Sequence, residues 1–195
     1  LGETPVSGSV PAQGSLDVTL HFTGTFEAGV DQPGDYFADL EVNGDPSFSV
    51  PVVMTVLAGA DMGKVQGVVM DNCSSEPVEA AIFIAGGVPI TQTMSDPATG
   101  EYTAWLVEGS YDLTFSANDY ISATVLVEIV AGEVQTLDVD LVPTYPCMAV
   151  QPQELEAWLL AGTEEFMHPS GLTLTNNGGE PLEFALFERE GLPYA

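Results

Sequence analysis

Apolar and polar residues alternate along most of this chain, which is the pattern of half-buried β-strands. The clearest runs are 16–22, 36–42 and 48–56, in each of which every second side chain is apolar. Further strand-like runs cover residues 63–70, 79–85, 109–117, 121–130 and 134–142. Gly, Pro and Asn-Asp turns separate these runs at the spacing typical of β-sandwiches, in which each sheet buries one face. The sequence therefore predicts an all-β fold, with Pro51 marking an edge strand or a bulge.

Residues 63–142 also carry an ordered series of short motifs. These are Gly63-Lys-Val-Gln-Gly-Val-Val69, Pro77-Val-Glu-Ala80, Asp96-Pro-Ala-Thr-Gly-Glu-Tyr102, Gly109-Ser-Tyr-Asp-Leu113 and Asn118-Asp-Tyr120. In this order and spacing they resemble the carboxypeptidase regulatory-like domain, a transthyretin-like β-sandwich. The family usually has Gly-Tyr where this chain has Asn118-Asp-Tyr120. The resemblance implies a non-catalytic domain at about 61–146.

The flanking segments resemble the two halves of an immunoglobulin-like repeat that is common in bacterial secreted and surface proteins. Residues 1–60 match its second half through Ser7-Gly-Ser-Val-Pro-Ala-Gln-Gly14, Pro33-Gly-Asp-Tyr36 and Val50-Pro-Val52. Residues 147–195 match its first half, with a hairpin of two core strands between Leu172 and Leu186. We also expect a strand at 153–160, although helix propensity alone allows a helix there. Together the segments predict tandem β-sandwiches, immunoglobulin-like and transthyretin-like.

Each half repeat on its own would expose an apolar sheet face and open strand edges, which folded proteins avoid. The expected partners are neighbouring domains of a parent chain. The two halves also complement one another, so a swapped homodimer is a second expectation.

Charge narrows the range of partners. The chain has 29 acidic residues against only two basic ones, Lys64 and Arg189, and a formal net charge of −27. Such a chain repels phosphate backbones and anionic lipid surfaces, so we expect no nucleic-acid partner. No run of about eighteen apolar residues occurs, so we expect no membrane insertion.

The two cysteines lie just before and just after the body of the central segment. An even pair around a small β-domain predicts a Cys73–Cys147 disulfide and an oxidising compartment, with two buried thiols as the alternative. The transthyretin-like resemblance adds a reason, because it implies that the first and last strands run side by side and parallel. Both cysteines would then emerge at the same end of the sandwich.

No catalytic constellation stands out. His21 and His168 could share a zinc ion with a carboxylate only at an unusually long spacing, and ordinary exposed histidines are the simpler interpretation. Neither cysteine has a basic neighbour that would activate its thiol. We therefore expect neither an enzyme nor a required cofactor.

Calcium is the one ligand that the sequence suggests. The candidate oxygen ligands on turns are Asp31, Asp35, Asp39, Asp96, Thr99 and Glu101. The chain has no Asp-x-Asp-x-Asp-Gly loop, and solvated turn carboxylates are the alternative. Trp105 is a candidate for binding sugars or proteins if it lies on the outside of its strand, whereas a buried Trp105 would be a core residue.

These observations predict a non-catalytic spacer or accessory segment of a larger extracellular or cell-surface protein, and the resemblance implies a bacterial one. Because the chain opens at Leu1 without an initiating Met, we expect a fragment or a processed product. Segments of this kind resemble those that follow the catalytic domain of secreted subtilisin-like peptidases. The alternative is a carbohydrate- or protein-binding adhesion module.

Overall fold

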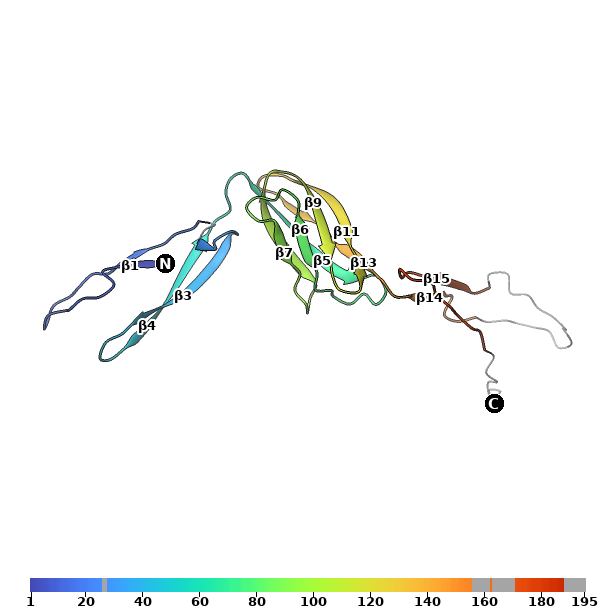
Figure 1. Ribbon diagram of the computed structural model, residues 1–195, viewed down its shortest axis with the longest axis horizontal. Coiled ribbons are helices and arrows are strands. Elements are labelled where there is room, and N and C mark those ends of the chain that lie inside the picture. Colours follow the sequence, from blue (N-terminus) through green and yellow to red (C-terminus); the bar gives the residue numbers. More distant parts are fainter. Residues whose placement is uncertain (26–27, 156–161, 163–170, 188–195) are drawn as a thin grey trace.

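The computed structural model describes residues 1–25, 28–155, 162 and 171–187, and within these ranges the regular elements are all β-strands (Figure 1). The all-β prediction is confirmed. Among the described residues, no helix is long and apolar enough to cross a membrane.

The N-terminal segment contains two separate antiparallel pairs. In the first, β1 (Gly2–Thr4) pairs with β2 (Thr19–His21). In the second, β3 (Gly34–Val42) and β4 (Phe48–Val56) form a long hairpin. The predicted strand at 16–22 is wrong in length, because only residues 19–21 pair. The sequence pattern does not predict β1, because it has three residues and is followed by a Pro/Ser/Gly-rich stretch.

Cross-strand register places the alternating apolar residues of the β3–β4 hairpin on one face. Leu40 lies opposite Val50 and Val42 opposite Phe48, and Val42, Val50 and Phe48 remain 46–59% exposed. Pro51 lies opposite Asp39 in this two-stranded sheet, so the expectation of an edge strand is confirmed.

The central segment opens with β5 (Met62–Asp71), around which one sheet is built. On one side β5 pairs antiparallel with β8 (Glu101–Val107). On the other side it pairs parallel with β12 (Val134–Thr136) and then with β13 (Val139–Pro143). A short strand, β10 (Tyr120–Ile121), pairs with β13 at the edge. The parallel arrangement of first and last strands is therefore observed.

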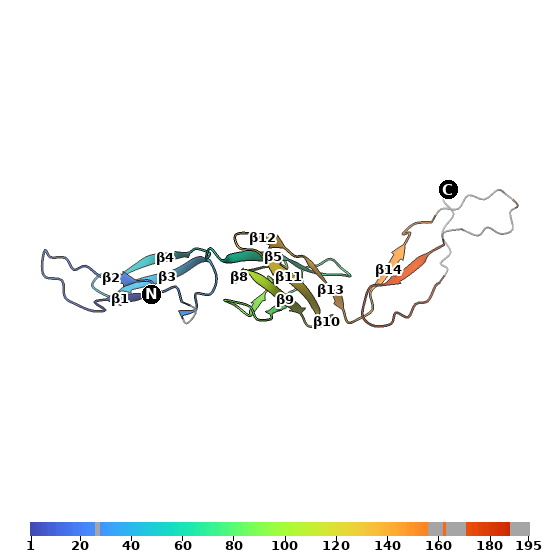
Figure 2. The same ribbon diagram turned by 90° about the horizontal axis from the view of Figure 1, so that it is seen from above.

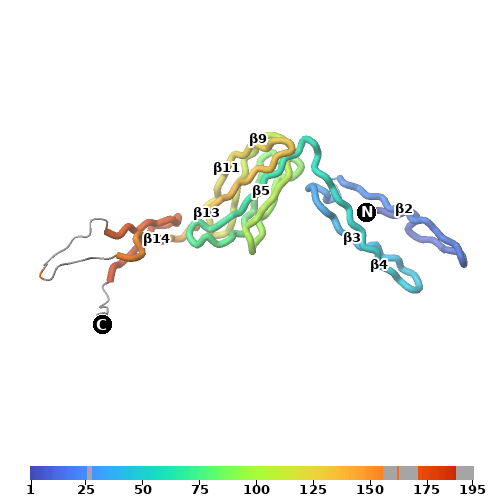
Figure 3. The backbone as a smooth tube through the Cα atoms, turned by 180° about the vertical axis from the view of Figure 1, so that it is seen from behind, coloured from blue at the N-terminus to red at the C-terminus, as the bar shows by residue number. Residues whose placement is uncertain are grey.

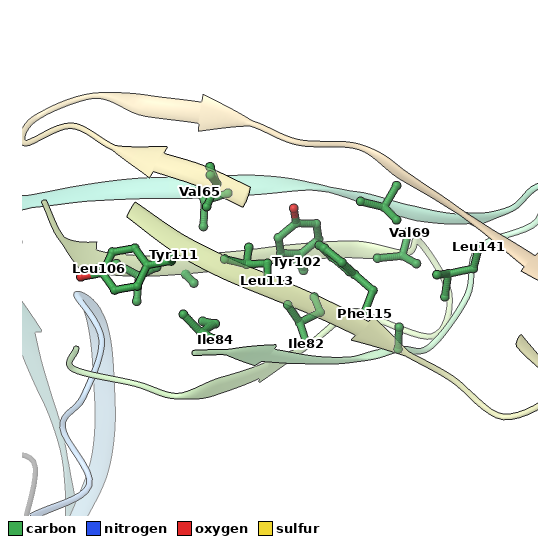
Figure 4. Packing of buried hydrophobic residues seen from close by; sticks show 14 of the residues in the cluster. Val65, Val69, Ile82, Ile84, Tyr102, Leu106, Tyr111, Leu113, Phe115 and Leu141 are labelled. Atoms are coloured by element: carbon green, nitrogen blue, oxygen red, sulfur yellow. The ribbon is translucent and has the colours of Figure 1, made fainter. Parts of the chain in front are cut away.

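The second sheet of the central segment has the order β11-β9-β6-β7. Its strands are β6 (Ala81–Ile84), β7 (Gln92–Met94), β9 (Gly109–Ser116) and β11 (Ala123–Ile129). The two sheets bury one core, to which Val65 and Val69 come from β5, Ile82 from β6 and Phe115 from β9 (Figure 4). Both predicted runs 121–130 and 134–142 are split in two. At Ser122 the chain passes from the sheet that contains β13 to the sheet that contains β9. Between β12 and β13 the Asp138 side chain, rather than a backbone carbonyl, accepts from the Val68 N–H.

Near the C-terminal side, β14 (Met148–Gln151) pairs antiparallel with β15 (Thr173–Asn176). The prediction of a hairpin within residues 172–186 is wrong, since β15 pairs with β14 and residues 180–187 form no strand. Most of the expected strand at 153–160, and also His168, lie outside the described residues.

The central sandwich lies between the N-terminal pairs and the C-terminal hairpin in all three views (Figures 1–3). Because β5 and β13 run parallel, the chain enters the sandwich at one end and leaves at the other. The N-terminal strand pairs and the C-terminal hairpin of one chain therefore lie at opposite ends of the sandwich (Figures 1–3).

The swapped dimer remains a prediction, and its measurement is simple. Light scattering at micromolar concentration is expected to give about twice the 20.5 kDa chain mass. Deleting residues 147–195 is expected to return the mass to one chain and to leave the first sixty residues without protection from hydrogen exchange. A single-chain mass for the intact protein would contradict the swap.

Candidate functional site

Where the chain leaves the central sandwich, several segments donate hydrogen bonds to one carboxylate. Asp71 ends β5 and is only 3% exposed. Its Oδ1 accepts hydrogen bonds from the backbone N–H groups of Cys73 and Ser74, the latter at 2.9 Å. Its Oδ2 accepts from the hydroxyl of Tyr120 at 2.7 Å and from that of Tyr145 at 3.3 Å. Asp71 thus joins β5, β10 and the segment between β13 and β14.

The disulfide lies in the same place. Cys73 and Cys147 are bonded, with 5.9 Å between their Cα atoms and a sequence separation of 74, so the expected pairing is present. Downstream, the N–H of Gly179 donates to the carbonyl of Pro143 at 2.8 Å, and Asn72 Nδ2 donates to the carbonyl of Asn177 at 3.4 Å. The turn after β15 therefore packs back onto the end of the sandwich.

Hydrogen bonding sets the charge state of this cluster. Burial raises the pKa of Asp71, but the hydrogen bonds from Tyr120, Ser74, Cys73 and Tyr145 outweigh it, so the net pKa lies below the ordinary value of 3.8. Burial, and then the hydrogen bond to Asp71, raises the pKa of the Tyr120 hydroxyl well above its usual value. The cluster is a charged carboxylate held by neutral phenols.

We expect Asp71→Asn to lower the free energy of unfolding by about 1–3 kcal/mol, because an amide cannot accept from all four donors. Since the folded pKa of Asp71 is below the unfolded one, its ionisation stabilises the fold above pH 3.8 and this contribution is lost as the pH falls through the folded pKa. Urea titrations of both proteins from pH 7 to pH 2.5 should show the difference shrinking at the acid end. The exposed Asp140→Asn variant is the control, and a difference that does not change with pH would contradict this role.

The entry of the sandwich is held by Gln32, which precedes β3. The backbone N–H of Trp105 donates to Gln32 Oε1 at 2.6 Å, and Gln32 Nε2 donates to the Trp105 carbonyl at 3.1 Å. The Tyr36 hydroxyl in turn donates to the Gln32 carbonyl at 2.7 Å. One side-chain amide thereby occupies a position on the free edge of β8 that a neighbouring strand would take.

Trp105 itself lies on the outer face of its strand. Tyr102, Ala104 and Leu106 are the inward residues of β8 and are at most 4% exposed, whereas Trp105 is half-buried and pairs in register with Lys64. It is neither a core residue nor a freely exposed platform.

An open groove of about 830 Å³ runs over the outer face near Lys64. Most of the residues that line it are polar, among them Lys64 and Gln66 from β5, Thr103 from β8, Thr93 from β7 and Asp138 after β12. Tyr102 offers no stacking surface there, since its ring is buried and its hydroxyl donates to the Leu137 carbonyl at 2.7 Å. The groove can offer hydroxyl, amide, carboxylate and one ammonium group to a polar ligand.

The calcium candidates are spread over two places. Asp35 and Asp39 lie on one face of β3, where Asp35 accepts a hydrogen bond from Thr55 at 2.6 Å, and Asp31 lies in the preceding loop. Within the described part of the chain, no three His, Cys, Asp or Glu side chains converge as metal ligands would.

The second set lies in the loop before β8. Asp96 accepts from the N–H groups of Ala98 and Thr99, and these hydrogen bonds lower its pKa. The N–H of Asp96 donates to the carbonyl of Glu101, and the hydroxyl of Thr99 accepts from the N–H of Glu101. The N–H groups of the loop itself therefore satisfy the Asp96 carboxylate as a hydrogen-bond acceptor, as in an Asx turn.

Sequence reasoning missed Asp71, Gln32 and the groove around Lys64. The run Asp71-Asn-Cys-Ser74 directly after a strand is a turn signal, and an Asx turn could have been expected there. Nothing local indicates the Gln32–Trp105 contact, which spans 73 positions.

No family model and no curated protein matches this chain. Among solved structures it is similar to a candidate carbohydrate-binding protein from Bacteroides uniformis, with 22% identity and a TM-score of 0.33. The match covers 51% of this chain and 48% of that chain, so this chain spans about half the length of the solved protein.

Proposed function

We propose that this chain is a non-catalytic spacer of a larger secreted or surface protein, and that it holds neighbouring domains in line. The observation that carries the proposal is the parallel pairing of β5 with β12 and β13. It sends the chain in at one end of the sandwich and out at the other, so each sandwich adds its length to the span. The ten residues of β5 alone correspond to about 33 Å of extended strand.

Three further features support this role. The ties at Gln32–Trp105 and around Asp71 oppose bending at the entry and at the exit. A disulfide suits an oxidising, extracellular location. The net charge of −27 favours solubility and discourages adhesion to anionic surfaces. In finer detail, the proposal is a carboxypeptidase regulatory-like sandwich between immunoglobulin-like halves, of the kind that accompanies subtilisin-like peptidases.

Small-angle scattering tests the spacer. A compact domain of 195 residues would have a radius of gyration of about 16 Å, and the in-line chain is expected to exceed this clearly at any salt concentration. Measurement on the fraction of single-chain mass, separated by size exclusion, avoids confusion with a dimer. A radius near the compact value would refute the proposal.

The second candidate function is a binding module that takes neutral glycans or a protein segment. The groove favours it, because one of its lining residues, Lys64, is the cross-strand neighbour of the outward-facing Trp105. Tryptophan fluorescence in the Trp158→Phe background would report Trp105 alone, since the chain has two Trp residues. Saturable quenching by a neutral polysaccharide that is lost in Lys64→Ala or Thr103→Val would support it. Linear or absent quenching by a panel of such polysaccharides would count against glycan binding.

A further inference from the structure

The connection of the chain through the central sandwich has a mechanical consequence. Tension on the two sides reaches the sandwich at Met62, where β5 begins, and leaves it beyond Pro143, where β13 ends. Because these strands are parallel neighbours, the two pulls act in opposite directions along one shared axis. The hydrogen bonds between the strands are then loaded in shear and resist the tension simultaneously. They do not break one after another, as they would if the strands were peeled apart.

The ladder that would be sheared runs along almost all of β5. Its bonds include Gly132 N–H to Met62 O at 2.8 Å, Leu137 N–H to Gln66 O at 2.8 Å and Asn72 N–H to Leu141 O at 3.0 Å. At the break between β12 and β13, the side chain of Asp138 fills the gap and accepts from the Val68 N–H at 3.0 Å. Gly67 makes this close approach possible, because a Cβ there would lie 2.0 Å from the Leu137 carbonyl oxygen.

The disulfide changes the path of the tension. Cys73 follows the end of β5 by two residues, and Cys147 follows the end of β13 by four, so the bond links the far end of β5 directly to the outgoing chain. Residues 74–146, which supply Phe115 and most of the core, lie outside that path.

We infer that β5 and the Cys73–Cys147 disulfide form a covalent tether through the sandwich, so that tension on the chain cannot extend residues 74–146 while the disulfide is closed. The purpose that we assign to the tether rests on the proposed spacer role. The tether keeps the span of the spacer fixed under load. When the disulfide is open, the β5–β12–β13 ladder is the second barrier to extension, and it resists in shear.

Single-molecule force spectroscopy tests this on the full chain, pulled by handles joined at its two termini without cysteine chemistry. The two cysteines are separated by 74 positions, so release of the chain between them would add about 250 Å at roughly 3.3–3.6 Å per extended residue. We expect no such step without reductant. With dithiothreitol, which supplies two electrons and two protons to give two thiols, we expect the step in nearly every trace. Cys73→Ser/Cys147→Ser should give it with or without reductant.

A matched pair of variants tests the shear barrier. In the reduced chain, Asp138→Ala removes an acceptor from the ladder and should lower the force of the 250 Å step, whereas Asp140→Ala, an exposed residue on β13, should leave it unchanged. Circular dichroism of the reduced chain confirms beforehand that the sandwich is folded. A 250 Å step without reductant would overturn the tether, and equal forces for the two variants would overturn the shear barrier. Failure of the spacer role would instead show in scattering at zero load, with the tether intact.

Discussion

Replacing Phe115 by Ala should lower the free energy of unfolding of the central sandwich by about 3–5 kcal/mol. Phe115 is completely buried on β9, between Ile82 of β6 and Ala123 of β11 in the cross-strand register. Its ring meets the edge of Tyr102 from the opposite sheet, with centroids 5.4 Å apart and planes at 72°. Truncation removes apolar contact from both sheets and leaves a cavity that close-packed neighbours cannot fill.

Phe37→Ala is the matched control, because Phe37 also lies on a strand but is 77% exposed. Urea unfolding, followed by a probe of the central sandwich, should give an unchanged slope and a lower midpoint for Phe115→Ala. The control should stay within about 0.5 kcal/mol of the parent protein. Similar midpoints for the two variants would contradict the assignment of Phe115 to the core.

Alternation was enough to predict the long strands of the central segment. In β9 and β11 the buried side chains include Tyr111, Leu113, Phe115, Val127 and Ile129, which are apolar positions of the alternation in the predicted runs 109–117 and 121–130. Where one face is buried, the period of two fixes which side chains point inward, so pattern and structure agree.

The missed and misplaced strands have different causes. β7 has only three residues, too few for a periodic signal. Residues 137–138 continue the apolar alternation of 134–142, yet the Asp138 side chain replaces a backbone acceptor in the ladder and breaks the strand. β1 follows from a long-range pairing with β2 that a Pro/Ser/Gly-rich stretch does not reveal.

The candidate sites were less predictable than the fold. The disulfide could be expected because an even pair of cysteines flanks the central segment, and the resemblance added the parallel strands that bring Cys73 and Cys147 together. Asp71 looked like one carboxylate among 29 acidic residues, and its role depends on Tyr120 and Tyr145, which are 49 and 74 positions away. Contacts of that separation are set by topology, which the local pattern does not contain.

Opening the Cys73–Cys147 disulfide should lower the free energy of unfolding by roughly 4 kcal/mol, the loop-entropy value for a closure of this length. Urea unfolding with and without dithiothreitol measures the change. Thiol titration in denaturant should find no free thiols before reduction and two afterwards. Cys73→Ser/Cys147→Ser should match the reduced protein and be insensitive to dithiothreitol. An equal midpoint under both conditions, despite complete reduction, would contradict the prediction.

The cost of opening the disulfide should also depend on Asp71, because the N–H of Cys73 donates to this carboxylate. With the disulfide closed, the turn from Asp71 to Ser74 is held from both ends, by the bond to Cys147 and by Tyr120 and Tyr145 on Oδ2. Once one constraint is lost, the turn is freer and the other constraint orders less of it. In a double-mutant cycle, Asp71→Asn should therefore cost less in the reduced protein than in the oxidised one, with a coupling of about 0.5 kcal/mol or more. Strictly additive free-energy changes would contradict the coupling, and would show that the disulfide and the Asp71 hydrogen bonds stabilise separate parts of the structure.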